Sequence, residues 1–259
     1  MQPFTLVRPN SLEAALDAFR GDAAYLAGGH TLIPAMKSRL RPVETLIDLA
    51  RLPGLAEVRR DGDRLVVGAM ARHAEVAAHP LVREAIPGLS KLAGGIGDPQ
   101  VRNRGTLGGS LANNDPAADY PAAALALDAV IETSAGTHAA EDFFQGMFAT
   151  ALEEGELIMS VAFRVPLASA YAKAPHPASR YALAGVYAAR FADGWRVAVT
   201  GATLGVARWP EAEAALAAGA PLPERLDSGD LASDMHASAD YRAHLAGVML
   251  RQAVAALQA

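Results

Sequence analysis

Cysteine is absent from the 259 residues of the chain. Its absence excludes disulfides, a thiol nucleophile and any cysteine-ligated zinc or iron–sulfur centre in this chain. The seven histidines form no H-x-x-x-H pair with a carboxylate, so we do not expect a metal site. Redox chemistry here would therefore need an organic cofactor. A chain without cysteine fits a reducing compartment, and the expected location is the cytoplasm.

Strong charge and long apolar runs are also missing. The formal net charge is −5 and the basic residues are scattered, which gives no electrostatic support for a nucleic-acid partner. No apolar run approaches the roughly 20 residues of a membrane span, and the first residues do not read as a secretory signal. Hydrophobic residues make up 51% of the chain, which is enough for a packed core.

Residues 1–55 alternate between strand and helix patterns. Strands are predicted at 4–7, 25–27 and 45–49, with helices beginning after Ser11, a good N-cap, and at Leu32. Alternation at this spacing indicates a small parallel β-α-β unit.

The rest of the chain divides near residue 168. Before it, strands are predicted at 65–70, 130–133 and 157–165, with helices at 74–78, 81–92 and from Pro121. Residues 169–180, with prolines at 175 and 177, read as a linker or an ordered loop. After them come a hairpin around Ala192-Asp193-Gly194, a helix at 210–218 and a final helix capped by Ser238.

Two segments carry almost no bulky side chains. The first is AGGHTLIPAMKSRL (27–40), and the second is RGTLGGSLANNDPAADYP (104–121). Glycines let a backbone approach a ligand and let N–H groups converge on an anion such as pyrophosphate. The asparagines and aspartates of the second segment suit ribityl hydroxyls or a ring edge. We therefore predict that the two segments meet and hold one anionic, polyhydroxylated ligand.

Each feature has a simpler interpretation when it is taken alone. A Gly-Gly pair after a strand is usually a tight turn, and His30 is then a turn histidine. Asp115-Pro116 is an ordinary turn, and Asp119 suits the N-cap of the following helix. The P-loop, the G-x-G-x-x-G fingerprint and the G-x-S-x-G elbow are all absent.

The two segments together resemble the flavin motifs of one family. AGGHT with PAMKSRL, and TLGG with DPAADYP, look like those of the FAD-binding medium subunits of molybdenum hydroxylases, the carbon monoxide dehydrogenase and xanthine dehydrogenase group. The resemblance extends along the chain through FTLVRPNSLEAAL, PASRYALAGV and SADYRAHLAGVMLRQAV.

The resemblance implies an α+β fold of the vanillyl-alcohol-oxidase type. Two subdomains, an α/β unit at 1–55 and an α+β unit at 56–168, would clamp FAD between them. A C-terminal domain at 169–259 would carry a small antiparallel sheet and helices.

The resemblance also implies which residues lie at the flavin. The first segment would wrap the pyrophosphate, and the second would close the other side and reach ribityl oxygens, with Asp119 near the polar edge of the isoalloxazine. Ile158 or Met159 would pack on a ring face, and His176 and Arg180 would lie near the flavin. The full predicted set is Leu26, Ala27, Gly28, Gly29, His30, Thr31, Leu32, Thr106, Gly108, Gly109, Ser110, Asn113, Asp115, Asp119, Ile158, Met159, His176 and Arg180.

The function implied is electron transfer within a larger enzyme. A large molybdenum subunit would oxidise the substrate, a small subunit with two [2Fe–2S] clusters would pass the electrons to FAD here, and an external acceptor would take them. A dimer of heterotrimers is the implied assembly. Two alternatives stay open at this point: a self-contained flavin reductase or oxidase, and a scaffold that has lost its flavin.

Overall fold

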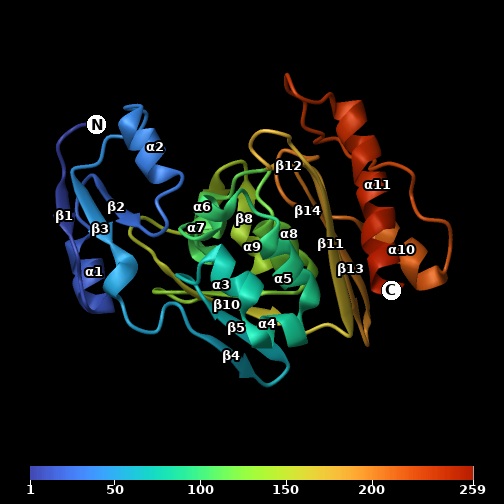
Figure 1. Ribbon diagram of the computed structural model, residues 1–259, viewed down its shortest axis with the longest axis horizontal. Helices are drawn as coiled ribbons and strands as arrows, with labels where there is room; N and C mark the ends of the chain where they lie inside the picture. The colour runs from blue at the N-terminus through green and yellow to red at the C-terminus, as the bar shows by residue number, and fades with distance from the viewer. Residues whose placement is uncertain (259) are drawn as a thin grey trace.

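The computed structural model describes residues 1–258 and arranges them around three main sheets (Figure 1). The first sheet is parallel, in the order β1-β3-β2, which confirms the predicted β-α-β unit. Its elements are β1 (Thr5–Val7), α1 (Leu12–Ala18), β2 (Ala23–Leu26), α2 (Leu32–Lys37) and β3 (Thr45–Asp48), followed by the 3₁₀ helix η1 (Leu49–Arg51). Ser11 caps α1 as expected, because its side chain accepts a hydrogen bond from the Ala14 N–H.

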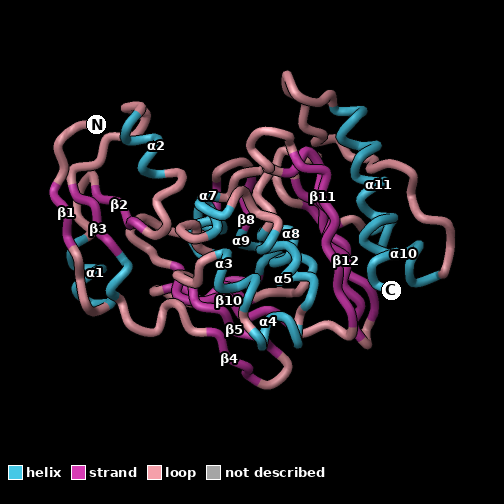
Figure 2. The backbone as a smooth tube through the Cα atoms, in the orientation of Figure 1, coloured by secondary structure: helices cyan, strands magenta, loops and turns pink. Residues whose placement is uncertain are grey.

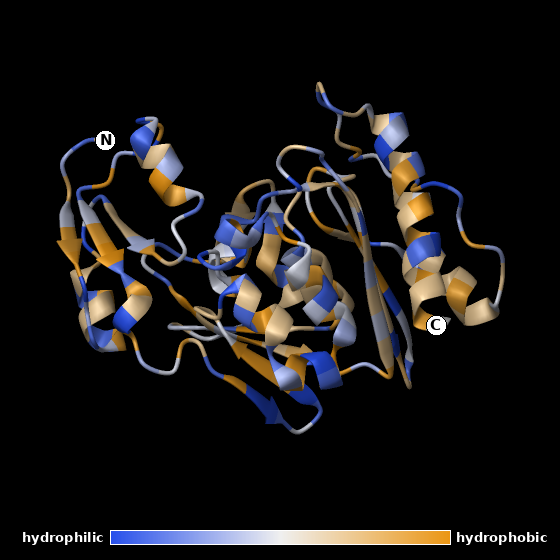
Figure 3. Ribbon diagram, viewed as in Figure 1, coloured by the Kyte–Doolittle hydropathy of each residue, from blue (hydrophilic) through white to orange (hydrophobic). Residues whose placement is uncertain are grey.

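The second sheet is antiparallel and has the order β4-β5-β10-β6-β7. Its strands are β4 (Val58–Asp61), β5 (Arg64–Gly68), β6 (Val130–Thr133), β7 (Thr137–Ala139) and β10 (Ile158–Arg164). The edge strand β4 carries Arg59, Arg60 and Asp61, and Figure 3 shows it as a hydrophilic ribbon. Charge on an edge strand discourages pairing with another chain.

Helices cover one face of this sheet. They are α3 (His73–Ala78), α4 (Pro80–Ala85), α5 (Pro87–Gly94), α6 (Pro99–Arg102), α7 (Leu107–Asn113) and α8 (Tyr120–Ala126). One helix was predicted at 81–92, but the chain breaks there into α4 and α5. The break comes at Ile86, because a residue before proline is disfavoured in the α region and Pro87 starts the new helix.

A small hairpin closes this unit. The short helix α9 (Ala140–Phe143) leads into β8 (Phe144–Gly146), which pairs with β9 (Ala149–Thr150). The side chain of Asn114 donates to the Gly146 and Ala149 carbonyls at 2.8 and 2.7 Å, which fixes the turn between the two strands.

The third sheet corrects the prediction for residues 169–180. Most of this segment is a strand and not a linker, because β11 (Ala168–Pro175) pairs along its whole length with β12 (Ala182–Phe191). The sheet continues through β13 (Gly194–Thr200) to β14 (Ala207–Arg208), and the predicted hairpin at residue 193 is present. Pairing decided the conformation of an alanine-rich strand whose own β propensity is weak.

The third sheet separates two hydrophobic cores. On one face of β12, Tyr187 and Phe191 join the core around α5 and α8; on the other, Val186 packs with α10 (Pro210–Ala218) and α11 (Ala239–Gln258). This alternation follows from the two-residue period of a strand. Figure 2 shows the resulting layers, with helices on both sides of β11 and β12. Both C-terminal helices were predicted, and Ser238 caps α11 through the Tyr241 N–H. Within the described residues no helix combines the length and the apolar character that a membrane span requires.

Candidate cofactor site

The two bare segments lie against each other. A Cβ atom placed on Gly28 would stand 2.3 Å from the Arg104 carbonyl oxygen and 2.7 Å from the Gly105 Cα. A Cβ on Gly109 would be 3.7 Å from that of Ala27. Residues about 75 positions apart are therefore in backbone contact, as the sequence predicted. Only glycine permits an approach this close at position 28.

The first segment leaves main-chain donors free. It runs from β2 into α2, with Gly29 in a left-handed conformation at φ 77°. Among residues 1–258, no hydrogen bond to a protein acceptor is made by the N–H groups of Gly29, His30 and Thr31. Three consecutive free N–H groups at a glycine turn form a concave donor set suited to an anionic oxygen cluster.

The N–H groups of Gly108 and Gly109 in the second segment already have acceptors within the protein. Gly108 N–H donates to the Ala69 carbonyl at 2.8 Å, and Gly109 N–H to the Thr106 hydroxyl oxygen at 3.2 Å. A Cβ on Gly108 would be 2.6 Å from the Ala69 Cβ, so this glycine lets α7 pack on the end of β5. The second segment thus supplies a closely packed wall, whereas the free donors belong to the first.

Polar side chains on α7 face out of this wall. Ser110 and Asn113 are three residues apart, so they share one face of the helix, and both are partly buried. Neither side chain makes a hydrogen bond within the described part of the chain, which leaves both groups available. Asp115 accepts from the Ala117 N–H at 2.9 Å through one oxygen, which shapes the turn that follows and leaves the other oxygen free.

Asp119 does not cap α8 with its side chain, although it occupies the N-cap position. Its buried carboxylate instead accepts hydrogen bonds from the Tyr171 hydroxyl and from the Lys173 ammonium, which lies 3.0 Å away. Burial raises the pKa of Asp119, while Lys173 and Tyr171 oppose that shift. Tyr171 and Lys173 are two positions apart on β11, so both point to this carboxylate.

Lys173 connects three segments. Besides Asp119, its ammonium donates to the Gly95 carbonyl and to the Arg180 carbonyl, each at 3.0 Å. All three ammonium protons are therefore engaged. This residue was missed by the sequence reasoning because its segment was interpreted as a linker. An alternating Tyr171–Lys173 pair was the signal that could have identified it.

Tyr181 is a second residue that the sequence reasoning missed. Its side chain is half-exposed at the start of β12, and its pKa is raised by burial and by the carboxylates of Asp115 and Asp119. Its aromatic ring therefore lies near the carboxylates of Asp115 and Asp119, where a planar heterocycle could stack on it.

The remaining predicted residues have mixed surroundings. Leu26 and Leu32 flank the first segment and pack into the small core around Met36. Ile158 is buried in the main core, and Met159 packs toward the first unit, with its carbonyl accepting from Ala69 N–H. In the β11–β12 turn, Arg180 is exposed and His176 is partly buried. Arg180 reaches Asp119 only through its main chain and Lys173.

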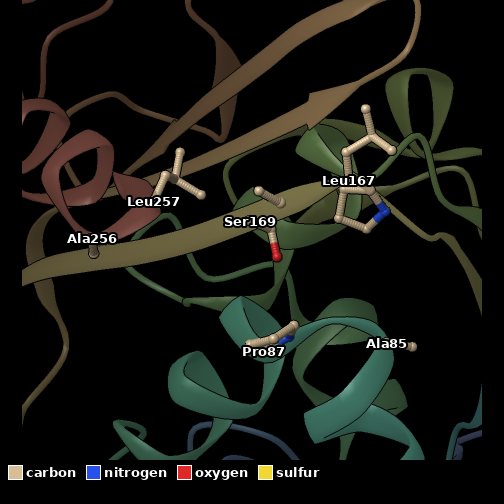
Figure 4. Close-up of a pocket in the computed structure, with 8 residues that line it drawn as sticks. Ala85, Pro87, Leu167, Ser169, Ala256 and Leu257 are labelled. Carbon is tan, nitrogen blue, oxygen red and sulfur yellow. The ribbon is translucent and has the colours of Figure 1, made fainter. Parts of the chain in front are cut away.

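A cavity of about 260 Å³ lies elsewhere, between α4, α5, β11 and the end of α11. Figure 4 shows Ser169 as a polar side chain among its otherwise apolar lining. Such a lining offers little to a pyrophosphate, so the contact between the two bare segments is the better candidate for a dinucleotide.

Known proteins resemble this chain in sequence and in structure. Residues 2–168 match the family model of the FAD binding domain in molybdopterin dehydrogenase. The chain is 34% identical to the carbon monoxide dehydrogenase medium chain of Hydrogenophaga pseudoflava, over 93% of this chain and 91% of that one. It is also 34% identical to the nicotine 6-hydroxylase medium subunit of Paenarthrobacter nicotinovorans, over 95% and 94%.

Solved structures are similar over almost the full length. A chain of the Cu,Mo-CO dehydrogenase superposes with a TM-score of 0.87 at 32% identity, covering 100% of this chain and 99% of that one. A chain of quinoline 2-oxidoreductase from Pseudomonas putida 86 superposes with a TM-score of 0.89 at 28% identity, covering 99% and 97%.

Proposed function

This chain belongs to the FAD-binding subunits of the molybdenum hydroxylase family, and from that premise we propose that it transfers electrons between partner subunits and an external acceptor through FAD. It is an oxidoreductase subunit, and FAD is its cofactor. FAD supplies the redox chemistry when it is bound, and the chain supplies binding, orientation and electrostatics.

The proposal depends on one observation: the free main-chain N–H groups of the first segment (27–40) lie against the closely packed second segment (104–121). The N–H groups of Gly29, His30 and Thr31 would hold the pyrophosphate, because they have no acceptor within the described protein. Gly28 would set the width of the site, since a Cβ there would meet the Arg104 carbonyl and the Gly105 Cα. A cradle of main-chain donors can spread the charge of two phosphates without a counter-ion side chain.

The other residues would hold the rest of the cofactor. Ser110, Asn113 and the free oxygen of Asp115 would serve the ribityl and phosphate oxygens. The Asp119 carboxylate, fixed by Lys173, would face the polar edge of the isoalloxazine, and Tyr181 would offer its ring. Thr106 still has its hydroxyl proton to donate, because its oxygen is the group that caps α7. Gly108 and Gly109 would close the far side by packing.

The partners follow from the chemistry that this chain lacks. With no cysteine, it cannot hold a cysteine-ligated [2Fe–2S] cluster, so such clusters would have to lie on another chain. Relatives are named as medium chains or subunits, which fits a small iron–sulfur subunit and a large molybdenum subunit. We propose a heterotrimer that pairs into a dimer of heterotrimers and acts in the cytoplasm.

The test has two arms. The purified chain, mixed with FAD and freed of excess, should show two flavin absorption bands at one FAD per chain. It should not turn over a substrate alone, whereas the complex co-expressed with partner subunits should reduce its flavin when substrate is added. Turnover by the isolated chain would favour a self-contained flavoenzyme. A colourless chain, alone and in the complex, would overturn the proposal.

A further inference from the structure

Two histidines join the β11–β12 turn to the segment before α11. The ring atom Nε2 of His176 lies 3.3 Å from Nδ1 of His236, and the two ring centroids are 4.4 Å apart. The His236 side chain is exposed, and that of His176 is partly buried. In Figure 1 this turn lies at the same end of the third sheet as the start of α11.

The hydrogen bonds of His176 determine the tautomers. Its Nδ1 accepts from the main-chain N–H groups of Ala178 and Ser179, each at 3.2 Å, so Nδ1 carries no proton. In the neutral ring Nε2 therefore carries the proton and donates it to Nδ1 of His236. The proton of His236 then lies on its own Nε2. A metal ion between the two rings would displace the proton that this arrangement requires.

One end of this link is fixed to the sheet. Asp234 accepts from the His236 N–H at 2.9 Å and from the Ala237 N–H at 3.0 Å. Its other oxygen lies 2.7 Å from the guanidinium of Arg242, a buried side chain that also donates to carbonyls of β12 and the β13 end. The main chain of His236 is therefore tied to the third sheet through Asp234 and Arg242.

The other end reaches the candidate flavin site. The turn carries Arg180, whose carbonyl accepts from Lys173, and Lys173 pairs with Asp119. The next residue, Tyr181, lies near the Asp115 and Asp119 carboxylates. Movement of the turn would thus displace two groups: the Arg180 carbonyl, which accepts from Lys173, and the ring of Tyr181.

Protonation of either ring breaks the arrangement. A proton added to Nδ1 of His236 would face the N–H of His176, and a proton added to Nδ1 of His176 would face two main-chain N–H groups. Asp234 accepts from the His236 main-chain N–H, and Arg242 already compensates its charge. On the turn side, Lys173 is already paired with Asp119, and Arg180 adds a positive charge to the turn itself. Histidines generally change charge between pH 5 and 8.

We propose that His176 and His236 are positioning residues whose neutral pair holds the β11–β12 turn against the flavin site and releases it when either ring is protonated. The part of this proposal that concerns FAD rests on the proposed function. The part that concerns the turn does not.

The test is amide hydrogen exchange of the whole chain between pH 8 and 5, corrected for the intrinsic pH dependence of exchange. Protection of the Ala178 and Ser179 amides should fall about tenfold across this range, which corresponds to the loss of two hydrogen bonds. His176→Asn keeps an acceptor for these amides, because asparagine bonds the backbone two residues on, but it has no ring to protonate. In this variant the protection of the Ala178 and Ser179 amides should not change with pH. His244→Gln, which alters an exposed histidine of α11, is the control and should behave as the natural chain does.

A second readout separates the two parts. FAD release, followed by flavin fluorescence, should accelerate as pH falls from 8 to 5 in the natural chain. In His176→Asn, which lacks the ring pair, release should be fast and independent of pH. Constant amide protection in the natural chain would overturn the proposal, whatever FAD does. If amide protection changes with pH and the rate of FAD release does not, the role of the histidine pair in holding the turn stands, and its link to the flavin is overturned. Failure of the chain to bind FAD at all counts against the proposed function and leaves the amide result to decide.

Discussion

The ammonium of Lys173 lies 3.0 Å from the Asp119 carboxylate, although 54 residues separate the two in the sequence. Both side chains are almost completely buried. A buried ion pair contributes little compared with apolar packing, but removal of one partner leaves an uncompensated charge. The stability of the candidate site around Asp119 should therefore be sensitive to substitution of either partner.

Replacing Lys173 by Met should destabilise the fold by about 3–5 kcal/mol at pH 8, because Asp119 would stay buried without its cation. The pKa of Asp119 is already raised by burial, and loss of Lys173 should raise it further. A carboxyl whose folded pKa is raised loses stability as pH rises above its unfolded value. The cost of Lys173→Met should therefore shrink as pH falls toward 5, measured by urea unfolding. The added change Asp119→Asn should recover part of it, and equal costs at both pH values would contradict the prediction.

Replacing Gly28 by Ala should abolish FAD retention and cost about 1–3 kcal/mol of stability, because the new Cβ would meet the Arg104 carbonyl at 2.3 Å. Gly136 offers a matched control, since a Cβ there has nothing within 4 Å. Gly136→Ala should keep one FAD per chain. The measurement is the ratio of flavin to protein absorbance after gel filtration. Retention of FAD by Gly28→Ala would show that the contact does not set the site.

His73 should make the fold less stable in acid. Burial, with smaller contributions from His30 and Arg102, lowers its pKa to about 4 from an ordinary 6.5. Between pH 6.5 and 4 the unfolded chain binds the proton more strongly, so stability should fall by about 3 kcal/mol as pH drops through this window.

The substitution His73→Leu should flatten that part of the stability curve, measured by urea unfolding at several pH values. His244→Gln should leave the slope as it is in the natural chain. An unchanged slope in His73→Leu would show that other groups control the acid sensitivity. The result also bears on the site, because the imidazole packs against Gly105, where a Cβ would meet Nε2 at 2.4 Å.

Asn114→Asp should cost about 2–3 kcal/mol at pH 7. The amide of Asn114 donates to the Gly146 and Ala149 carbonyls, and a carboxylate of the same shape would oppose both acceptors. Asn113→Asp is the matched control on the neighbouring residue, and its stability should change by less than about 0.5 kcal/mol. Thermal unfolding of the two variants would measure the difference. Equal transition temperatures would refute the assigned role of the amide.

The site was predictable where the signal was local and unpredictable where it was not. The two bare segments were identifiable because glycine and small polar residues cluster there. Which segment offers free donors was not predictable, because it depends on whether Ala69 and Thr106 satisfy the second one. The resemblance placed either Ile158 or Met159 on a ring face. The structure places the Ile158 side chain in the main core and that of Met159 against the first unit, and the role of either at the flavin stays a prediction.

The sequence by itself determined what depends on composition and neighbouring residues. The lack of cysteine, the caps at Ser11 and Ser238, the hairpin at Asp193 and the parallel β-α-β unit all follow from local patterns. The tertiary structure alone decided that residues 168–175 form a strand and that Lys173 meets Asp119. A weakly β-forming alanine-rich segment takes its conformation from the partner strand, and a buried charge takes its partner from the packing of distant elements. Neither kind of information is present in a local stretch of sequence.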